Sequence, residues 1–423
     1  MMSKSFILCM LALLMMLPRP AGAEVLSWEE CIRLTAEHNP TLVAAREKVR
    51  AAEAGRESAR SARRPQLSAS GSAEHAEQDG QTPDANASLS AGVNARQTLY
   101  SGGRIAASIE TADAALQGAR ADHESASAEV TFRLRSAFVS MLHAQEQVLV
   151  LRRIVERRAD NRELVGLRYE GGREHKGSLA LSEASMHQAR TELGQAERQV
   201  AASRQVLVRT MGLEGEHPAL TVAGALEGGS APEAVDWDAA AMRTPDYARA
   251  EASVRSAEAS VRTARSGYRP DISLGGSAGR TGDTDAFDSD RWAIGVQLSF
   301  PFWSGGQTRA EVARARAQLS LAEAQRSETL NGKVSDLSEL LVSFRNALEN
   351  VDVQTRFFEA SDLRAEIARE QYGAGLLSFD NWDVIENERI SYQRRLLESQ
   401  RAALLAESAW MRATGTGVFD IEE

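Results

Sequence analysis

The chain has 423 residues, of which 26% are charged, and its formal net charge is −10. Nucleic-acid binding depends on a basic surface that neutralises phosphates, so an acidic chain of this kind argues against a nucleic-acid partner. From its length alone the chain would form two or three domains.

The first 23 residues have the pattern of a secretory signal peptide. Lys4 precedes an apolar run over residues 6–17, and Ala21-Gly22-Ala23 forms an A-x-A cleavage site. The run is too short for a transmembrane helix, which needs about 20 apolar residues. Removal of this segment takes Lys4 and Arg19 with it, so the formal net charge changes from −10 to −12.

Cysteine content restricts the chemistry of the mature chain. Cleavage after Ala23 leaves Cys31 as the last remaining cysteine, which excludes an intramolecular disulfide and a cysteine-based metal site. Because Cys31 lies several residues beyond the cleavage site, an N-terminal lipid is not expected. We predict a small buried thiol in a helix.

The mature chain contains an internal duplication. Related positions are separated by 205 residues at first and by 203 residues after a short loop. The matched positions are Pro40 with Pro245, Pro65 with Pro270, Gly102 with Gly305, Tyr169 with Tyr372, and Gly172 with Gly375. The predicted domains are repeat 1 over 24–212, a linker over 213–236, repeat 2 over 237–414 and a tail over 415–423.

Each copy begins with a predicted helix, over about 28–62 and 237–266, that stops before Pro65 or Pro270 because proline removes a donor and restricts its predecessor. A β-hairpin follows in each copy, over 65–100 and 270–302. The polar stretches 75–86 and 280–290 are predicted to be exposed hairpin loops.

The outgoing strand of the second hairpin, "RWAIGVQLSF", alternates large apolar residues with small or polar ones. The apolar set is Trp292, Ile294, Val296, Leu298 and Phe300, and the first copy has a weaker set at Leu89, Ala91, Val93 and Ala95. Aromatic residues at both ends of the face indicate the interfacial girdles of a membrane barrel. A half-buried sheet of a soluble protein would show the same alternation, so this strand leaves both interpretations open.

A very long helix follows each Gly-Gly pair, Gly102-Gly103 and Gly305-Gly306, over 103–169 and 305–372. Apolar residues recur at spacings of three and four, as in a coiled-coil seam, and the charged stretch "RRIVERR" at 152–158 is assigned to the helix backs. The seams contain Ile105, Ile109, Ala112, Leu116, Ala119, Leu134, Ala137, Met141, Ala144, Val148, Leu151 and Val155, and Val312, Ala315, Leu319, Ala322, Leu337, Leu341, Phe344, Leu348 and Val351. At 1.5 Å per residue the first such helix is about 100 Å long.

Glycine-rich turns, "RYEGGREHKGS" and "QYGAGLLSFD", end these helices, because glycine accepts the positive φ that reverses a chain. Return helices are predicted over 179–211 and 379–414. The resulting four strands cannot close a barrel, and an open sheet edge is not tolerated in lipid, so the strands must be shared among subunits.

The signal peptide, the repeat, the "LYSGGR" and "FPFWSGGQTR" junctions and the Y-x-x-G turns at Tyr169 and Tyr372 resemble the TolC family of outer-membrane efflux proteins. The resemblance implies an α+β membrane protein: a homotrimer with a twelve-stranded β-barrel, four strands per chain, continued by an α-helical coiled-coil tunnel across the periplasm. It also implies a passive exit duct in the outer membrane of a Gram-negative bacterium, without enzymatic activity or cofactor. The implied partners are a periplasmic adaptor (membrane fusion) protein, an inner-membrane pump or ABC transporter, and outer-membrane lipid, in a tripartite efflux pump or a type I secretion system.

The same resemblance places an acidic pair after the second Y-x-x-G turn at a periplasmic aperture, with Tyr372 as part of the gate. Here the pair is Asp380 and Asp383, whose spacing of three places both on one helix face. Threefold symmetry would make each a ring of carboxylates that attracts cations. The alternative is the ordinary preference of acidic residues for a helix N-terminus. Leu376 and Leu377 stand where some members of the family carry a basic gate partner.

The two tips, at Gly172, Arg173 and Gly375, are candidate contacts for the adaptor, although a solvated loop would have the same composition. A soluble periplasmic coiled-coil adaptor or scaffold is the alternative function, and the apolar-faced hairpins argue against it. A hydrolase using Ser277 of "GGSAG" lacks the strand, turn and helix that a nucleophile elbow requires. No histidine has metal-ligand spacing, so no metal site is predicted.

Overall fold

The computed structural model describes residues 25–76, 86–215, 217–283 and 286–419, and the expected signal peptide lies outside them. The elements of the first half are β1 (Val25–Leu26), α2 (Trp28–His38), α3 (Pro40–Ser61), β2 (Gln66–Ala76), β3 (Asn86–Ser101), α4 (Arg104–Glu170) and α5 (Lys176–Met211). Those of the second half are β4 (Thr221–Val222), α6 (Trp237–Met242), α7 (Pro245–Ser266), β5 (Asp271–Asp283), β6 (Ala286–Ser299), α8 (Gln307–Gly373) and α9 (Phe379–Ala413).

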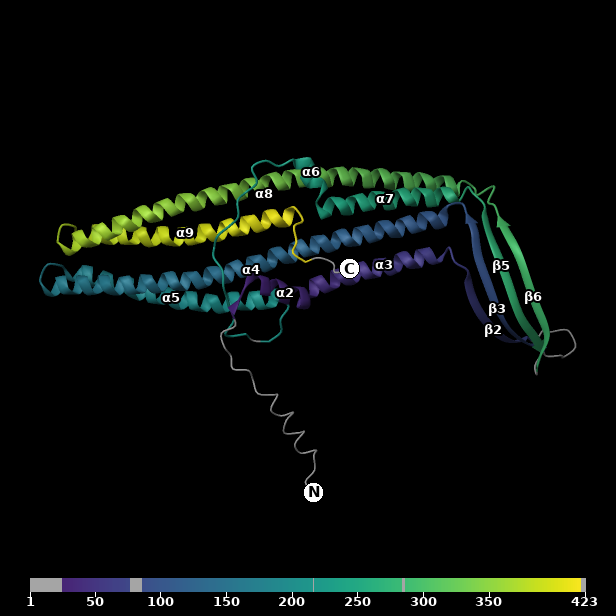
Figure 1. Cartoon of the computed structure of the whole chain (residues 1–423), viewed down its shortest axis with the longest axis horizontal. Helices are drawn as coiled ribbons and strands as arrows, with labels where there is room; N and C mark the ends of the chain where they lie inside the picture. The colour runs from purple at the N-terminus through teal and green to yellow at the C-terminus, as the bar shows by residue number, and fades with distance from the viewer. Residues whose placement is uncertain (1–24, 77–85, 216, 284–285, 420–423) are drawn as a thin grey trace, which may run out of the picture. The chain divides into compact units, whose positions relative to one another are not determined.

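These elements, labelled in Figure 1, belong to two compact units that do not follow the predicted repeats. Of the described residues, unit 1 contains 25–40, Glu129–Glu233 and Glu339–Arg412, whereas unit 2 contains Thr41–Ala128, Ala234–Ser338 and 413–419. Each unit therefore combines segments from both halves of the sequence.

The prediction of one continuous helix at the start of each half was wrong. Asn39 and Thr244 are extended, with ψ of 118° and 145°, and each precedes a proline that opens a new helix. Proline clashes with a helical predecessor, and its missing N–H is harmless at the first helical position. Pro40 and Pro245 therefore separate α2 from α3 and α6 from α7.

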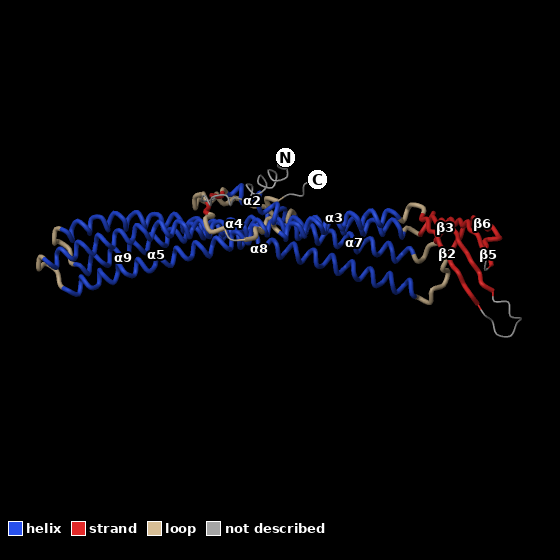
Figure 2. The backbone as a smooth tube through the Cα atoms, turned by 90° about the horizontal axis from the view of Figure 1, so that it is seen from below, coloured by secondary structure: helices blue, strands red, loops and turns tan. Residues whose placement is uncertain are grey.

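Unit 2 contains a four-stranded antiparallel sheet in the order β2-β3-β5-β6 (Figure 2). Directly paired residues point to the same side of a sheet, so the register assigns each row to one face. Ala69, Val93, Ala278 and Trp292 form one row, whereas Ser68, Asn94, Ser277 and Ala293 form the next. One face is apolar and the other is polar or small across all four strands.

The apolar set predicted for the last strand is strongly exposed in the chain, from 54% for Phe300 to 78% for Trp292. The loop prediction for 280–290 was wrong, because Arg280–Asp283 extend β5 and Ala286–Asp290 extend β6. Backbone pairing continues there despite the polar side chains, which antiparallel strands tolerate on an exposed face. Most of the other predicted loop, 77–85, lies outside the described residues.

Two glycines on the polar face allow β3 and β5 to approach closely. A Cβ at Gly279 would lie 2.7 Å from the Ala91 carbonyl oxygen and 3.0 Å from the Gly92 Cα, closer than real Cβ contacts. The strands β3 and β6 lead into the long helices α4 and α8 through Gly-Gly pairs with positive φ, 63° and 93° at Gly102 and Gly103 and 60° and 88° at Gly305 and Gly306.

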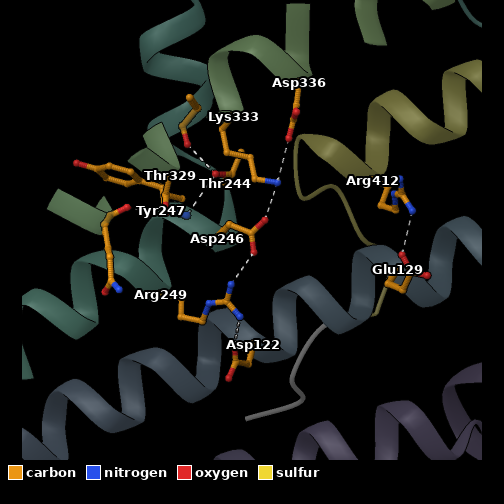
Figure 3. A network of polar contacts seen from close by, with 12 residues as sticks. Asp122, Glu129, Thr244, Asp246, Tyr247, Arg249, Thr329, Lys333, Asp336 and Arg412 are labelled. Carbon is orange, nitrogen blue, oxygen red and sulfur yellow. Dashed lines mark hydrogen bonds and ion pairs between the residues drawn. The ribbon is translucent and has the colours of Figure 1, made fainter. Parts of the chain in front are cut away.

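Ion pairs connect the helices of unit 2. Arg56 of α3 contacts Asp113 of α4 at 2.5 Å, and Arg326 of α8 contacts Glu251 of α7 at 3.0 Å. Figure 3 shows a network around Asp246, in the first turn of α7. Lys333 of α8 lies 2.7 Å from Asp246, and Arg249 lies 3.4 Å from Asp246 and 3.6 Å from Asp122 of α4. The network thus connects three helices.

In unit 1, α4, α5, α8 and α9 pack through narrow apolar seams. The residues of the predicted seams are buried or half-buried in both units, and Leu134 and Met141 of unit 1 and Leu337 of unit 2 are completely buried. One core combines Val148, Leu151 and Ile154 of α4 with Ala189 and Ala196 of α5. Small residues let the helix backbones approach, so the long helices are stabilised by packing rather than by propensity alone.

Part of the predicted linker belongs to unit 1. Its strand β4 pairs in parallel with β1, and the Gln145 side chain of α4 makes two hydrogen bonds of 3.0 Å with the backbone of Val222. Cys31 of α2 is fully buried, as predicted, and burial raises the pKa of its thiol to about 12. Within the described ranges, no helix combines the length and apolarity required to cross a bilayer.

The contact at Gly279 yields a stability prediction. Gly279→Ala should lower the unfolding free energy by about 1–3 kcal/mol, because the added methyl group overpacks the β3–β5 contact. The thermal midpoint of the purified protein in detergent should fall accordingly. Gly295→Ala is the matched control, because a Cβ there meets no atom within 4 Å. Equal midpoints for the two variants in thermal circular dichroism would contradict this account of the close approach.

Candidate functional site at the helix turns

The turns that end α4 and α8 have the same backbone geometry. Gly172 and Gly375 have φ of 70° and 79°. The N–H of Arg173 donates to the carbonyl of Arg168 at 2.8 Å, and that of Leu376 donates to Gln371 at 2.8 Å. This is the Schellman arrangement, in which glycine at the left-handed position allows otherwise unpaired carbonyls to be satisfied.

An aromatic cluster lies beneath the second turn. Tyr372 is fully buried and stacks on Trp382 with ring centroids 4.3 Å apart, and Phe379 meets both rings edge-on at 6.3 Å. The Arg168 guanidinium lies 4.5 Å from the Tyr372 ring centroid and donates to the Tyr372 carbonyl. Stacking and cation–π contacts of this kind are strengthened by desolvation. The cluster fixes the start of α9 against the end of α4.

Glu174 connects the two turns. The Tyr372 hydroxyl donates to one Glu174 oxygen at 3.0 Å, and the Ser178 hydroxyl donates to the other at 2.9 Å. Burial alone would raise the pKa of the Glu174 carboxyl, but these hydrogen bonds outweigh it and hold the pKa below its ordinary value. Burial, together with the bond to Glu174, raises the pKa of the Tyr372 phenol above its ordinary range.

The two predicted acidic residues have different surroundings. Asp380 is exposed in the first turn of α9. The Asp383 side chain is only 20% exposed, lies 3.3 Å from the Arg158 guanidinium of α4 and accepts a hydrogen bond of 2.9 Å from Asn387. Asp380 therefore presents a carboxylate to solvent, whereas Asp383 is paired within its own chain.

A buried ion pair lies one turn further along α9. Glu386 is 1% exposed and accepts two hydrogen bonds from Arg157 of α4, at 2.8 and 2.7 Å. The hydrogen bonds to Glu386 raise the pKa of the Arg157 guanidinium. The assignment of the whole stretch 152–158 to an exposed back was therefore wrong for Arg157 and Arg158, because both turn toward acceptors on α9.

The tip residues singled out by the sequence, Gly172, Arg173 and Gly375, are all exposed. Leu376 is 80% exposed, whereas Leu377 packs against the aromatic cluster. Sequence reasoning missed Arg168, Trp382 and Glu386. It expected Glu174, with Arg173, His175 and Lys176, to be an exposed residue of the first turn that contacts an adaptor, whereas Glu174 is half-buried and hydrogen-bonded to Tyr372 and Ser178. The spacing of three between Asp383 and Glu386 was a usable signal for a shared helix face, but their partners lie more than 200 residues away.

The site has the character of a structural junction, with Asp380 exposed in the first turn of α9. Among the described residues, no group of three His, Cys, Asp or Glu side chains is placed to hold a metal ion.

Comparison with known sequences gives a family match over most of the chain. The model of the outer membrane efflux protein family matches residues 31–213 and again residues 237–416. The chain is 25% identical over 180 residues to the solvent efflux pump outer membrane protein SrpC of Pseudomonas putida, covering 42% of this chain and 38% of that protein. It is 30% identical over 184 residues to the pyoverdine export outer membrane protein OpmQ of Pseudomonas putida, covering 41% and 38%. The matches thus span about two fifths of the length of these relatives.

Solved structures show the same fold. The membrane-channel protein CusC matches with a TM-score of 0.80 at 18% identity, covering 92% of each chain. The outer membrane protein VceC of Vibrio cholerae matches with a TM-score of 0.78 at 20% identity, covering 93% of this chain and 96% of that one.

The bond between Tyr372 and Glu174 yields a pH-dependent prediction. Tyr372→Phe keeps the stacking but loses the hydrogen bond, which should lower stability by about 1 kcal/mol at neutral pH. Because the pKa of Glu174 is lower in the folded state, its ionised carboxylate contributes stability at pH values above the ordinary carboxyl pKa. This contribution is lost as the pH falls through the folded-state pKa. The thermal midpoints of the wild type and Tyr372→Phe should therefore converge as the pH falls below the lowered, folded-state pKa of Glu174.

Tyr169→Phe serves as the control for this experiment, because Tyr169 is exposed at the equivalent sequence position of the first half. A Tyr372→Phe difference that persists at acid pH, or that Tyr169→Phe reproduces, would show that the bond to Glu174 is not the cause.

The buried pair yields a second prediction for this site. Glu386→Gln leaves Arg157 charged and without a carboxylate in a buried position, which should cost about 3–5 kcal/mol in unfolding free energy. Asp352→Asn, in an exposed pair with Arg356 at 3.0 Å, is the control and should change stability little. The measurement is the denaturant midpoint in detergent, and similar midpoints for the two variants would argue against a stabilising role for the buried pair.

Proposed function

Because the chain belongs to the outer membrane efflux protein family, we propose that it is a passive exit duct through the outer membrane, serving a tripartite efflux pump or a type I secretion system. The observation that carries this proposal is the sheet with one continuous apolar face, attached to long helix hairpins. No catalytic residue or cofactor is required, because a duct works by its shape and by the charge of its lining.

The proposed assembly is a homotrimer. The sheet of one chain has two edge strands, β2 and β6, and an unpaired edge in lipid leaves costly N–H and C=O groups. Three chains with four strands each would close a twelve-stranded barrel and remove every edge. The twofold internal repeat is part of this proposal and is supported by the two successive matches of the family model.

The apolar face would then contact outer-membrane lipid, with Trp292 and Phe300 near the two interfaces. In a soluble periplasmic adaptor this apolar face would be exposed to water, where it has no role. The polar face would line the channel, and the helices would form the periplasmic tunnel.

The proposed partners follow from this placement. A periplasmic adaptor (membrane fusion) protein would contact the exposed tips at Gly172, Arg173 and Gly375, and would connect the duct to an inner-membrane pump or ABC transporter. The names of the relatives describe solvent efflux in SrpC and pyoverdine export in OpmQ. An exported small molecule is therefore the proposed cargo class, with secreted polypeptides as the alternative.

We place the periplasmic aperture at the start of α9. Asp380 would supply a ring of three exposed carboxylates, which attracts cations. Asp383 and Tyr372 would act in the same constriction by holding α9: Asp383 through Arg158, and Tyr372 through Glu174. The exposure of Asp380 and the internal pairing of Asp383 support this division of roles.

Single-channel recording in planar bilayers tests the proposal. The purified wild type should insert and give small, cation-selective currents. Asp380→Asn should reduce the cation selectivity, because the exposed ring loses its charge. Asp383→Asn should increase the conductance more than it changes selectivity, because α9 loses its contact with Arg158.

Failure of the wild type to form any channel would contradict the duct. Channels whose conductance and selectivity are the same in both variants would retain the duct and overturn the aperture assignment.

A further inference from the structure

The polar face of the sheet carries two arginines without an ion-pair partner among the described residues, Arg96 of β3 and Arg291 of β6. Arg96 pairs in register with Gly275, which pairs with Gly295. The neighbouring row of Ala95, Gly276 and Ile294 belongs to the apolar face. Since side chains alternate along a strand, Arg96 points to the polar side. Arg291 shares that side through its pairing with Gly279.

Arg96 borders a shallow hollow of about 490 Å³, whose lining combines polar side chains with glycines and with apolar residues that include Ile294 and Val296. The glycines beside Arg96 in its row lack side chains, so the guanidinium has open space next to it. The other polar side chains of the hollow are Asn94, Ser273, Ser277 and Gln297. The hollow contains amide, hydroxyl and guanidinium groups and no carboxylate.

Acidic residues on this face lie only near the ends of the described strands. Asp271 is at the start of β5 and is already paired with Arg104 at 2.9 Å. Glu74 is near the other end, in the row of Ser88. Between them, the charged residues of the polar face are Arg96 and Arg291, so the middle of this face has a net positive charge.

Arg280, on the opposite face of the sheet, differs from Arg96 and Arg291 because it has an ion-pair partner. It lies on the apolar face, in the row of Ala91, and its guanidinium is 2.6 Å from Asp290. An arginine near lipid has to be neutralised by a partner, because an unpaired charge is costly there. In the part of the chain that the structure describes, neither Arg96 nor Arg291 has an ion-pair partner, and a guanidinium left open in this way is a ready donor to an oxyanion.

We propose that Arg96, together with Arg291, forms an anion-selecting site on the inner wall of the duct, which favours passage of small molecules carrying carboxylate or phosphate groups. This inference rests on the proposed function, since closure of the barrel places three copies of each arginine around one water-filled pore. Rings of arginine select anions by charge, as rings of carboxylates select cations. The duct then has two filters of opposite sign, Asp380 at the tunnel tip and Arg96 in the barrel.

The test is the reversal potential of the full-length trimer in planar bilayers under a KCl gradient. All variants are compared in the Asp380→Asn background, so that the acidic ring does not dominate the selectivity. Arg96→Gln should lower the chloride-to-potassium permeability ratio severalfold, whereas Arg96→Lys should retain it. Arg280→Gln is the matched control, because it removes an arginine from the opposite face, and the ratio should stay unchanged.

A second measurement uses inorganic phosphate as the probe, added to either side of the open channel. Phosphate should reduce the chloride current of the Asp380→Asn channel, and Arg96→Gln should weaken this block. Arg291→Gln should also weaken the phosphate block. This second variant keeps the test decisive if Arg96→Gln fails to insert.

The outcomes separate the two proposals. Channels that form normally, but whose selectivity and phosphate block are the same with Arg96→Gln and Arg291→Gln as without them, overturn the anion site and leave the duct intact. A wild type that forms no channels overturns the duct, and the anion site with it.

Discussion

The strand register of the four-stranded sheet is the constraint on which the rest of this structure depends. Because side chains alternate with a period of two, a slip of one residue would exchange the apolar and polar faces of a whole strand. The observed pairing keeps Ile294, Val296 and Leu298 on one side and Ser277, Asn94 and Arg96 on the other. The Gly92–Gly279 contact and the shift between Thr98 and Tyr100 fix where β3 and β5 meet. The separation of the apolar face from the polar face that carries Arg96 and Arg291 follows from this register.

The helices depend on a different combination of forces. Their seams are narrow and rich in alanine, so the apolar area buried per residue is small. Ion pairs between neighbouring helices supplement this packing, and their strength varies with burial. The exposed pair between Arg364 of α8 and Glu388 of α9 contributes little, whereas the Arg157–Glu386 pair is desolvated and fixes the register of α9 against α4. At the turns, Tyr372 combines stacking with a hydrogen bond to Glu174, which connects the ends of two hairpins. Charge therefore determines where the helix ends lie, and the seams hold the helices together.

The candidate site could be predicted only in part. The positions of the glycine turns and of Asp380 at a helix start could be inferred from spacing and resemblance, because positive φ and helix periodicity are local properties. The role of Asp383 was not accessible, since its environment depends on Arg158, 225 residues earlier in the chain. The helix breaks at Pro40 and Pro245 were missed although the signal was local, because the alanine-rich pattern continues on both sides of each proline. The pairing of β4 with β1 had no sequence signal, since each strand has two residues.

The sequence by itself determined the long helices and the main strands and their order, through the alternating strand at 292–300, the heptad seams and the glycine junctions. These features follow from periodicity and backbone preference, which act over a few residues. Only the tertiary structure decided which polar groups meet. It paired Asp383 with Arg158, buried Glu386 against Arg157 and left Arg96 open beside two glycines. The physical reason is that the energy of a charge depends on its partner and its exposure to water, and both are set by segments far apart in the chain.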